Sequence, residues 1–145
     1  MSDHELAARL ATEAGDLLLG VRSELADGTA EERKAAGDKR SHDFLMAALA
    51  SERPGDAVLS EEGVDDPVRL TAHRVWIVDP LDGTREFSEP PRADWAVHVA
   101  LVSDGVPVAG SVALPAQGLV LNRVPASVLP PPPPARPRAA GAGPG

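Results

Sequence analysis

The sequence predicts an α+β fold with a largely antiparallel or mixed sheet. Two segments in the first third of the chain repeat apolar residues at helical spacing, and several short apolar runs typical of strands follow as far as residue 114. Helices followed by a group of strands indicate an α+β domain. The length of 145 residues is that of one domain of ordinary size, large enough to bury a core.

The first helix is expected from about Asp3 to Leu25. Ser2 or Asp3 would cap its first turn, and Asp27-Gly28-Thr29 would end the pattern. The charged run Glu31-Glu32-Arg33-Lys34 is expected to be a solvated loop or a frayed turn. The apolar residues of this helix share one face; they are Leu6, Leu10, Leu17, Leu18, Val21 and Leu25.

The second helix is expected to begin with Asp38 as its N-cap and to run to about Ser51. Pro54-Gly55 would end it, because proline cannot continue the helical hydrogen bonds. Its apolar face consists of Phe44, Leu45, Ala48 and Leu49.

Four apolar segments are expected to form strands. Ala57–Leu59 and Val75–Val78 read as short strands, and Trp95–Val102 and Val106–Leu114 as longer ones. The longer two are joined by Ser103-Asp104-Gly105, and Asp-Gly between two apolar runs favours a hairpin.

The composition excludes several classes of protein. With 22 acidic and 14 basic residues the net charge is -8, which argues against a general nucleic-acid binder. The absence of cysteine excludes a disulfide scaffold and a thiolate metal site. No apolar run approaches the roughly 20 residues that span a bilayer, and the acidic start Met1–Glu5 lacks the positive charge of a signal peptide. We therefore expect a cytoplasmic protein without a membrane span.

Proline is concentrated at the end of the chain. Eight of the 15 prolines lie in the last 21 residues, together with Gly, Ala and Arg and without any acidic residue. Such a composition cannot build a core and favours extended or flexible chain. We expect a folded part over residues 1–121 and a disordered Pro/Ala/Gly-rich tail over residues 122–145. The proline run would alternatively serve as a ligand for a groove-binding partner.

Acidic residues follow two of the expected strands. Asp79 ends the strand Val75–Val78, and Asp82 follows it in the run Asp79-Pro80-Leu81-Asp82-Gly83-Thr84. Two neighbouring carboxylates repel each other unless a cation lies between them, and Mg²⁺ prefers oxygen ligands of this kind. Free N–H groups at a helix start near Gly83 and Thr84 would suit a phosphate group.

Glu61-Glu62 follows the strand Ala57–Leu59 and would reach the same end of the sheet. Each acidic feature also has a plainer interpretation: the run from Asp79 to Thr84 would be an ordinary turn, and Glu61-Glu62 would be a solvated pair of surface charges. Both together favour a metal site, and spacing alone leaves the two interpretations open.

Two motifs resemble those of the inositol monophosphatase superfamily, which consists of Mg²⁺-dependent, lithium-sensitive phosphatases. They are Leu59-Ser60-Glu61-Glu62 and Trp76-Ile77-Val78-Asp79-Pro80-Leu81-Asp82-Gly83-Thr84. The continuation Arg85-Glu86-Phe87 is similar to the CysQ branch, the 3'(2'),5'-bisphosphate nucleotidases. The similarity covers about residues 3–121. It implies the layered α/β sandwich of that family.

The resemblance implies a set of metal ligands. Glu61, Asp79 and the carbonyl of Leu81 would hold a first Mg²⁺ ion. Asp79 would bridge to a second ion that Asp82 also holds.

It also implies catalytic and substrate-binding roles. Thr84, with Asp38 as its partner and Glu61 nearby, would orient the attacking water. The substrate would lie against Glu61, Leu81, Asp82, Gly83 and Thr84. The substrate of this branch is 3'-phosphoadenosine 5'-phosphate, a by-product of sulfate assimilation, which is hydrolysed to AMP and phosphate. An inositol-1-phosphatase or another sugar-phosphate phosphatase is the alternative.

Other residues are given plainer roles. Trp76 and Trp95 are expected to pack in the core. His98 lies inside a strand pattern and is expected to be structural rather than catalytic. Arg85 would either help to set the substrate preference or be an ordinary surface charge.

The sequence departs from the family pattern after Leu121. The W-D-x-x-[AG] motif, which supplies a further Asp to the second metal, is missing. We expect a fragment or a frameshifted chain with weak or absent activity. A non-catalytic module that binds metal or a partner is the other alternative. Its uncovered sheet edge would favour a homodimer or aggregation.

Overall fold

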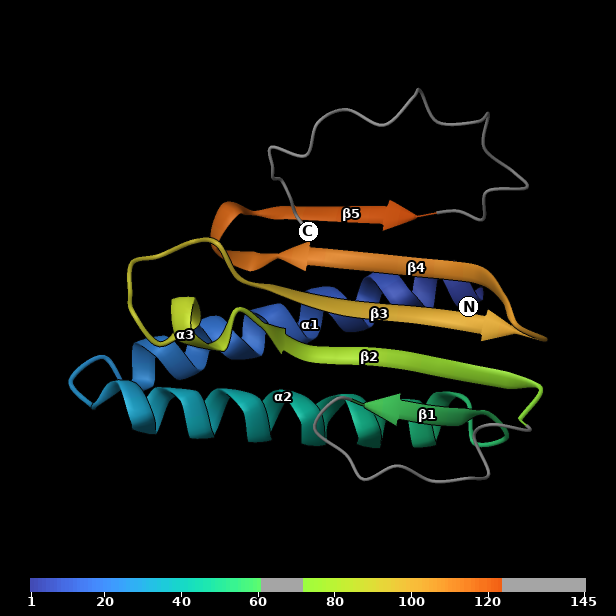
Figure 1. Ribbon diagram of the computed structural model, residues 1–145, viewed down its shortest axis with the longest axis horizontal. Coiled ribbons are helices and arrows are strands. Elements are labelled where there is room, and N and C mark those ends of the chain that lie inside the picture. Colours follow the sequence, from blue (N-terminus) through green and yellow to red (C-terminus); the bar gives the residue numbers. More distant parts are fainter. Residues whose placement is uncertain (61–71, 124–145) are drawn as a thin grey trace.

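Two long helices cover one face of a five-stranded sheet (Figure 1). The computed structural model describes residues 1–60 and 72–123. The predicted α+β fold and the largely antiparallel sheet are confirmed. The elements are α1 (Asp3–Glu24), α2 (Ala30–Glu52), β1 (Ala57–Ser60), β2 (Arg74–Asp82), α3 (Thr84–Phe87), β3 (Ala96–Ser103), β4 (Val106–Leu114), a 3-10 turn (Pro115–Gln117) and β5 (Leu119–Arg123).

The first helix begins where the sequence predicts. The Ser2 hydroxyl accepts a hydrogen bond from the Glu5 backbone N–H, and the Glu5 carboxylate accepts one from the Ser2 N–H. This reciprocal capping box satisfies two N–H groups that have no partner within the helix. Ser2 is therefore the N-cap, and Asp3 is the first helical residue.

The second helix begins nine residues before the predicted start, since its N-cap is Thr29 and not Asp38. Thr29 and Glu32 form a second capping box, with bonds of 3.0 and 2.8 Å between side chain and backbone. The charged run 31–34 is therefore the first turn of the helix, and the prediction of a loop there was wrong. Two acidic residues in that turn suit the positive end of the helix dipole.

The sheet has the order β1-β2-β3-β4-β5, with β1 parallel to β2 and all other pairs antiparallel. The predicted hairpin joins β3 to β4, where Ser103 pairs with Val106. Asp104 and Gly105 both have positive φ, 51° and 79°, which is the geometry of a tight turn that matches strand twist.

The fifth strand was not predicted from the sequence. Leu119 to Arg123 pairs with β4, after Gly118 turns the chain with a φ of 68°. The strand continues two residues past the predicted domain boundary at 121. The predicted disordered tail from residue 124 onward lies outside the described residues.

The core lies between the helices and the sheet. Trp76 and Trp95 are fully buried, as predicted. Alternate residues of the central strands, among them Val78, Val97 and Val99, face the helices and are buried as well. No helix within residues 1–60 and 72–123 has both the length and the apolar character needed to cross a membrane.

Candidate metal centre

A β-bulge in β2 sets the geometry of the acidic motif. Asp79 pairs with His98 on β3, and Asp82 pairs with Ala96. Three steps along β2 therefore match two steps along β3, so β2 holds one extra residue between the two aspartates. Pro80 lies in this bulge, where its missing N–H costs no ladder hydrogen bond.

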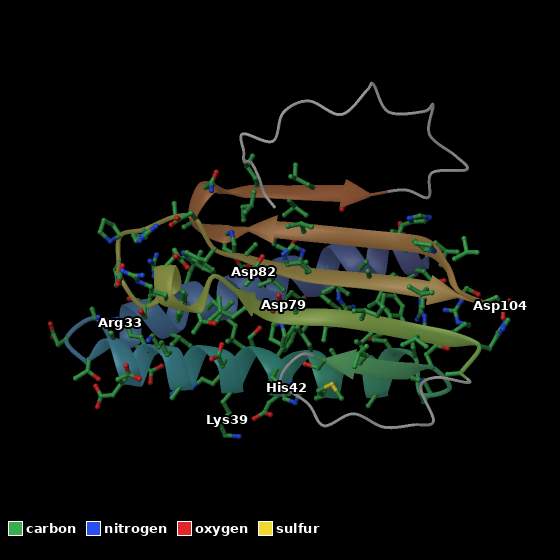
Figure 2. The ribbon with its side chains drawn as sticks, viewed as in Figure 1. Arg33, Lys39, His42, Asp79, Asp82 and Asp104 are labelled. Atoms are coloured by element: carbon green, nitrogen blue, oxygen red, sulfur yellow. The ribbon has the colours of Figure 1, made fainter. Side chains whose placement is uncertain are left out.

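The bulge decides on which face the carboxylates lie. In a regular strand, residues three apart point to opposite faces of the sheet. Because the bulge contains one extra residue, the alternation of side chains shifts by one position between the two aspartates. Asp79 and Asp82 therefore lie on the same face of the sheet, the face opposite the helices, and His98 lies on that face too. Figure 2 shows the two aspartates together at the end of β2, with Asp104 at the far end of the same sheet.

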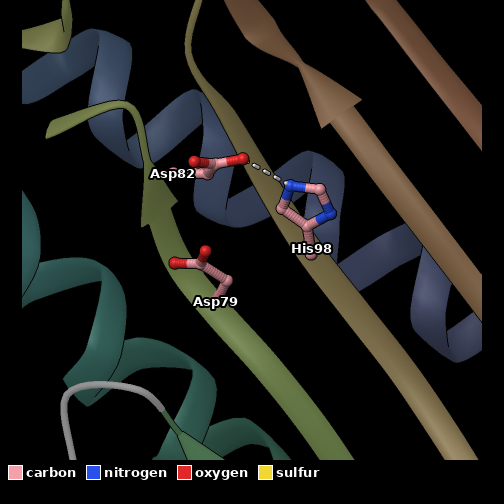
Figure 3. A group of neighbouring side chains, drawn as sticks. All are labelled: Asp79, Asp82 and His98. Atoms are coloured by element: carbon pink, nitrogen blue, oxygen red, sulfur yellow. Dashed lines mark hydrogen bonds and ion pairs between the residues drawn. The ribbon is translucent and has the colours of Figure 1, made fainter. Parts of the chain in front are cut away.

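Asp79, Asp82 and His98 form one cluster (Figure 3). Their potential ligand atoms all lie within 4.8 Å of one another, and His98 Nε2 is 3.0 Å from Asp82 Oδ2. Asp79 is half-buried and Asp82 is exposed. Two carboxylates and an imidazole are suitable ligands for a divalent metal ion.

His98 was expected to be structural, and no spacing in the sequence connects it with this cluster. Its position on the outer face follows from strand alternation. Its position beside Asp79 follows only from the pairing register of β2 and β3.

Helix α2 supports the motif from the other side of the sheet. The Ser41 hydroxyl, which is fully buried, donates a 2.7 Å hydrogen bond to the Pro80 carbonyl. Gly37 allows close approach, because a Cβ at that position would lie 2.6 Å from the Phe87 ring. The backbone after Asp79 is therefore fixed by a buried hydrogen bond and by packing.

The structure brings Thr84 and Asp38 together. The Thr84 hydroxyl lies 3.3 Å from Asp38 Oδ1 and 3.4 Å from the Leu81 carbonyl oxygen, so its proton is shared between two acceptors. Gly83 starts α3 with a φ of 85°, a backbone conformation that L-residues with a Cβ rarely adopt. The Leu81 N–H lies 3.3 Å from Asp79 Oδ1 and donates to it.

Glu61 lies outside the described residues. The strand before it, β1, ends at Ser60, which pairs with Val78, the residue preceding Asp79. The Ser60 hydroxyl also lies 2.9 Å from His42 Nδ1 on α2.

Arg22 of α1 holds the segment that follows the motif. Its Nε donates to the Phe87 carbonyl at 2.8 Å, and its Nη2 donates to the Arg92 carbonyl at 2.7 Å. The guanidinium carbon is 5.5 Å from the centre of the Phe87 ring and 5.2 Å from that of Trp95. Burial, helped by the nearby charge of Arg33, lowers the pKa of Arg22. The chain between α3 and β3 is thus tied to the first helix.

The chain forms an α+β domain, with a mixed sheet covered by two helices and a candidate metal-binding cluster at the bulged end of a central strand. The chain belongs to the inositol monophosphatase family, whose model matches residues 3–125. Proteins of this family are metal-dependent. The predicted family is therefore confirmed.

Individual relatives agree with this assignment. The chain is 53% identical over 133 residues to a 3'-phosphoadenosine 5'-phosphate phosphatase of Mycobacterium leprae, covering 86% of this chain and 48% of that protein. CysQ of Bacteroides thetaiotaomicron superimposes with a TM-score of 0.68 at 35% identity, over 84% of this chain and 46% of that one. Inositol monophosphatase II of Staphylococcus aureus gives a TM-score of 0.76 at 26% identity, over 86% and 46%. The chain spans about half the length of these relatives.

Proposed function

We propose that the chain forms the metal- and phosphate-binding part of a Mg²⁺-dependent phosphatase that hydrolyses 3'-phosphoadenosine 5'-phosphate to AMP and phosphate. The observation that carries this proposal is the 53% identity to the mycobacterial phosphatase of that name, over a region that includes the Asp79–Thr84 motif. The acidic cluster supports it, because the reaction class needs a divalent cation beside a phosphate ester.

The residues fit a hard cation. Asp79 and Asp82 present carboxylate oxygens from one face of a rigid bulge, and their mutual repulsion falls when a cation lies between them. In this proposal the carbonyl of Leu81 and the carboxylate of Glu61 complete the ligands. When bound, the metal ions supply Lewis acidity that favours hydroxide formation and stabilises the leaving oxygen.

Thr84 is proposed to orient the attacking water. When the Thr84 hydroxyl donates its hydrogen bond to Asp38, the lone pairs of Oγ1 are left to accept a hydrogen bond from that water. Gly83 and Thr84 are further proposed to bind the substrate phosphate through their backbone N–H groups.

The test is phosphate release from 3'-phosphoadenosine 5'-phosphate by the full chain, with Mg²⁺ and with added lithium. Asp79→Asn is expected to lower the rate at least 100-fold, because it removes a charged metal ligand. Asp104→Asn, an exposed aspartate at the far end of the sheet, is the matched control and is expected to keep the rate. Turnover by the wild type that survives unchanged in Asp79→Asn would contradict the proposal.

An inositol-1-phosphatase is the second candidate, and the similarity to the Staphylococcus aureus inositol monophosphatase favours it. A higher kcat/KM for inositol 1-phosphate than for 3'-phosphoadenosine 5'-phosphate in the same assay would select it. A non-catalytic module would give no turnover with either substrate. The homodimer expected from the sequence stays a prediction, which sedimentation of the full chain would test.

A further inference from the structure

His98 contacts the acidic cluster from the neighbouring strand. It lies directly across from Asp79, and its Nε2 is 3.0 Å from Asp82 Oδ2 (Figure 3). An ionised carboxylate can only accept hydrogen bonds. In a contact with the ionised Asp82 carboxylate, Nε2 is therefore the donor, and its N–H directs a hydrogen bond to Oδ2.

This arrangement argues against direct coordination of a metal by His98. A ring nitrogen that carries a proton has no lone pair to offer. Nδ1, the ring nitrogen that keeps a lone pair in this arrangement, lies on the side of the ring away from Asp79 and Asp82 (Figure 3).

Within the described part of the chain, the Asp82 side chain is held by His98. The side chain of Asp82 is 58% exposed, and His98 is its one hydrogen-bond partner among the described residues. Without that bond, the carboxylate would be free to rotate into solvent.

We propose that His98 is a positioning residue for the metal site. It binds Asp82 Oδ2 and so leaves Oδ1 directed to the cation that Asp79 also binds. This proposal rests on the proposed metal-dependent function and assigns a role to a residue that does not touch the metal. It implies that the site keeps oxygen ligands only, which suits Mg²⁺.

The experiment is a titration of the full chain with Mn²⁺, a stand-in for Mg²⁺ whose free ion is measured by electron paramagnetic resonance. His98→Ala is expected to raise the Kd roughly tenfold, the usual effect of losing a hydrogen-bond partner of a metal ligand. His98→Gln places an amide N–H near the position of Nε2 and is expected to bind within about threefold of the wild type. His73→Ala is the matched control, because the His73 side chain is exposed and hydrogen-bonds Asp104, at the other end of the sheet. Circular dichroism melts check that each variant is folded.

Three results would overturn the proposal while the metal site stands. The first is a Kd for His98→Ala equal to that of the wild type. The second is a Kd for His98→Gln as weak as that of His98→Ala. The third is a directly coordinated nitrogen, seen by pulsed electron paramagnetic resonance of the Mn²⁺ form and lost in His98→Ala. If wild type and Asp79→Asn both leave free Mn²⁺ unchanged at millimolar concentrations, the metal site itself fails and the role of His98 fails with it.

Discussion

Replacing Arg22 with methionine removes the charged donor that ties the segment after α3 to the first helix. Methionine fills a similar volume and keeps a favourable contact with the aromatic rings. The change therefore isolates the hydrogen bonds to the Phe87 and Arg92 carbonyls from the packing around them. The third bond, to Glu86, is 3.3 Å long and contributes less.

The expected loss follows from these contacts. A hydrogen bond from a charged donor contributes about 1.5 kcal/mol or more to stability, and two short bonds are lost, so we expect a loss of about 3 kcal/mol. For a chain of this size that loss lowers Tm by about 10 °C. Arg22→Lys keeps the positive charge but lacks the planar set of donors of a guanidinium. We expect it to lower the free energy of unfolding by about half as much as Arg22→Met.

The assay is urea unfolding of the full chain, followed by tryptophan fluorescence. Both tryptophans, Trp76 and Trp95, are fully buried, so the signal reports the loss of the core. Arg85→Met is the control, since this side chain is 75% exposed and its ion pair with Glu89 is 3.5 Å long, so the expected change is below about 0.5 kcal/mol. A free energy of unfolding for Arg22→Met within about 1 kcal/mol of that control would refute the reasoning.

Three further substitutions test other parts of the fold. Although burial acts to raise the pKa of Asp56, hydrogen bonds from Arg74 and Trp76 outweigh it and hold the pKa below its ordinary value of 3.8. Because the folded pKa is lowered, the stability that the ionised carboxylate adds is present above pH 3.8 and is lost as the pH falls through the folded pKa. Asp56→Asn should therefore cost about 1–2 kcal/mol at pH 7, and unfolding curves of wild type and variant should converge in acid; a difference that persists unchanged at low pH would contradict this. Gly83→Ala should cost about 1–2 kcal/mol, because the φ of 85° strains an L-residue and the new Cβ would lie 3.0 Å from a carbonyl oxygen. Equal thermal melts for this variant and the wild type would exclude that strain. Thr29→Ala should cost about 1 kcal/mol and lower the helical circular dichroism signal of α2, since it removes one half of a capping box, and an unchanged signal and Tm would show that the cap is dispensable.

Local patterns predicted much of the fold. The hairpin at Asp104-Gly105 was predictable, because both positions require positive φ and the sequence offers residues that tolerate it. The start of α2 was missed although Thr29 and Glu32 have capping-box spacing, because the charges after them were interpreted as a loop. The fifth strand was missed because Leu119–Arg123 is short, and what identifies it is its pairing with β4.

In the candidate site, too, local sequence patterns predicted some residues, whereas contacts between distant segments place the others. Asp79 and Asp82 were predicted from a motif within one segment of sequence. The contact between Thr84 and Asp38 joins positions 46 residues apart, and only the resemblance to a family suggested it. The place of His98 depends on the register between two strands, which no spacing within the sequence encodes.

The extra residue between Asp79 and Asp82 makes this part of the gene sensitive to length. A codon substitution at Leu81 would change a side chain and keep the geometry of the strand. Deletion of a single codon there would remove the bulge. Asp79 and Asp82 would then be two residues apart in a regular strand and would still share one face, but Pro80 would have to pair in the regular ladder, where it has no N–H to donate. In-frame insertions and deletions in this stretch are therefore expected to be far less tolerated than substitutions. Comparing the two kinds of mutation in a library of this segment, scored by folded yield, would measure that difference directly.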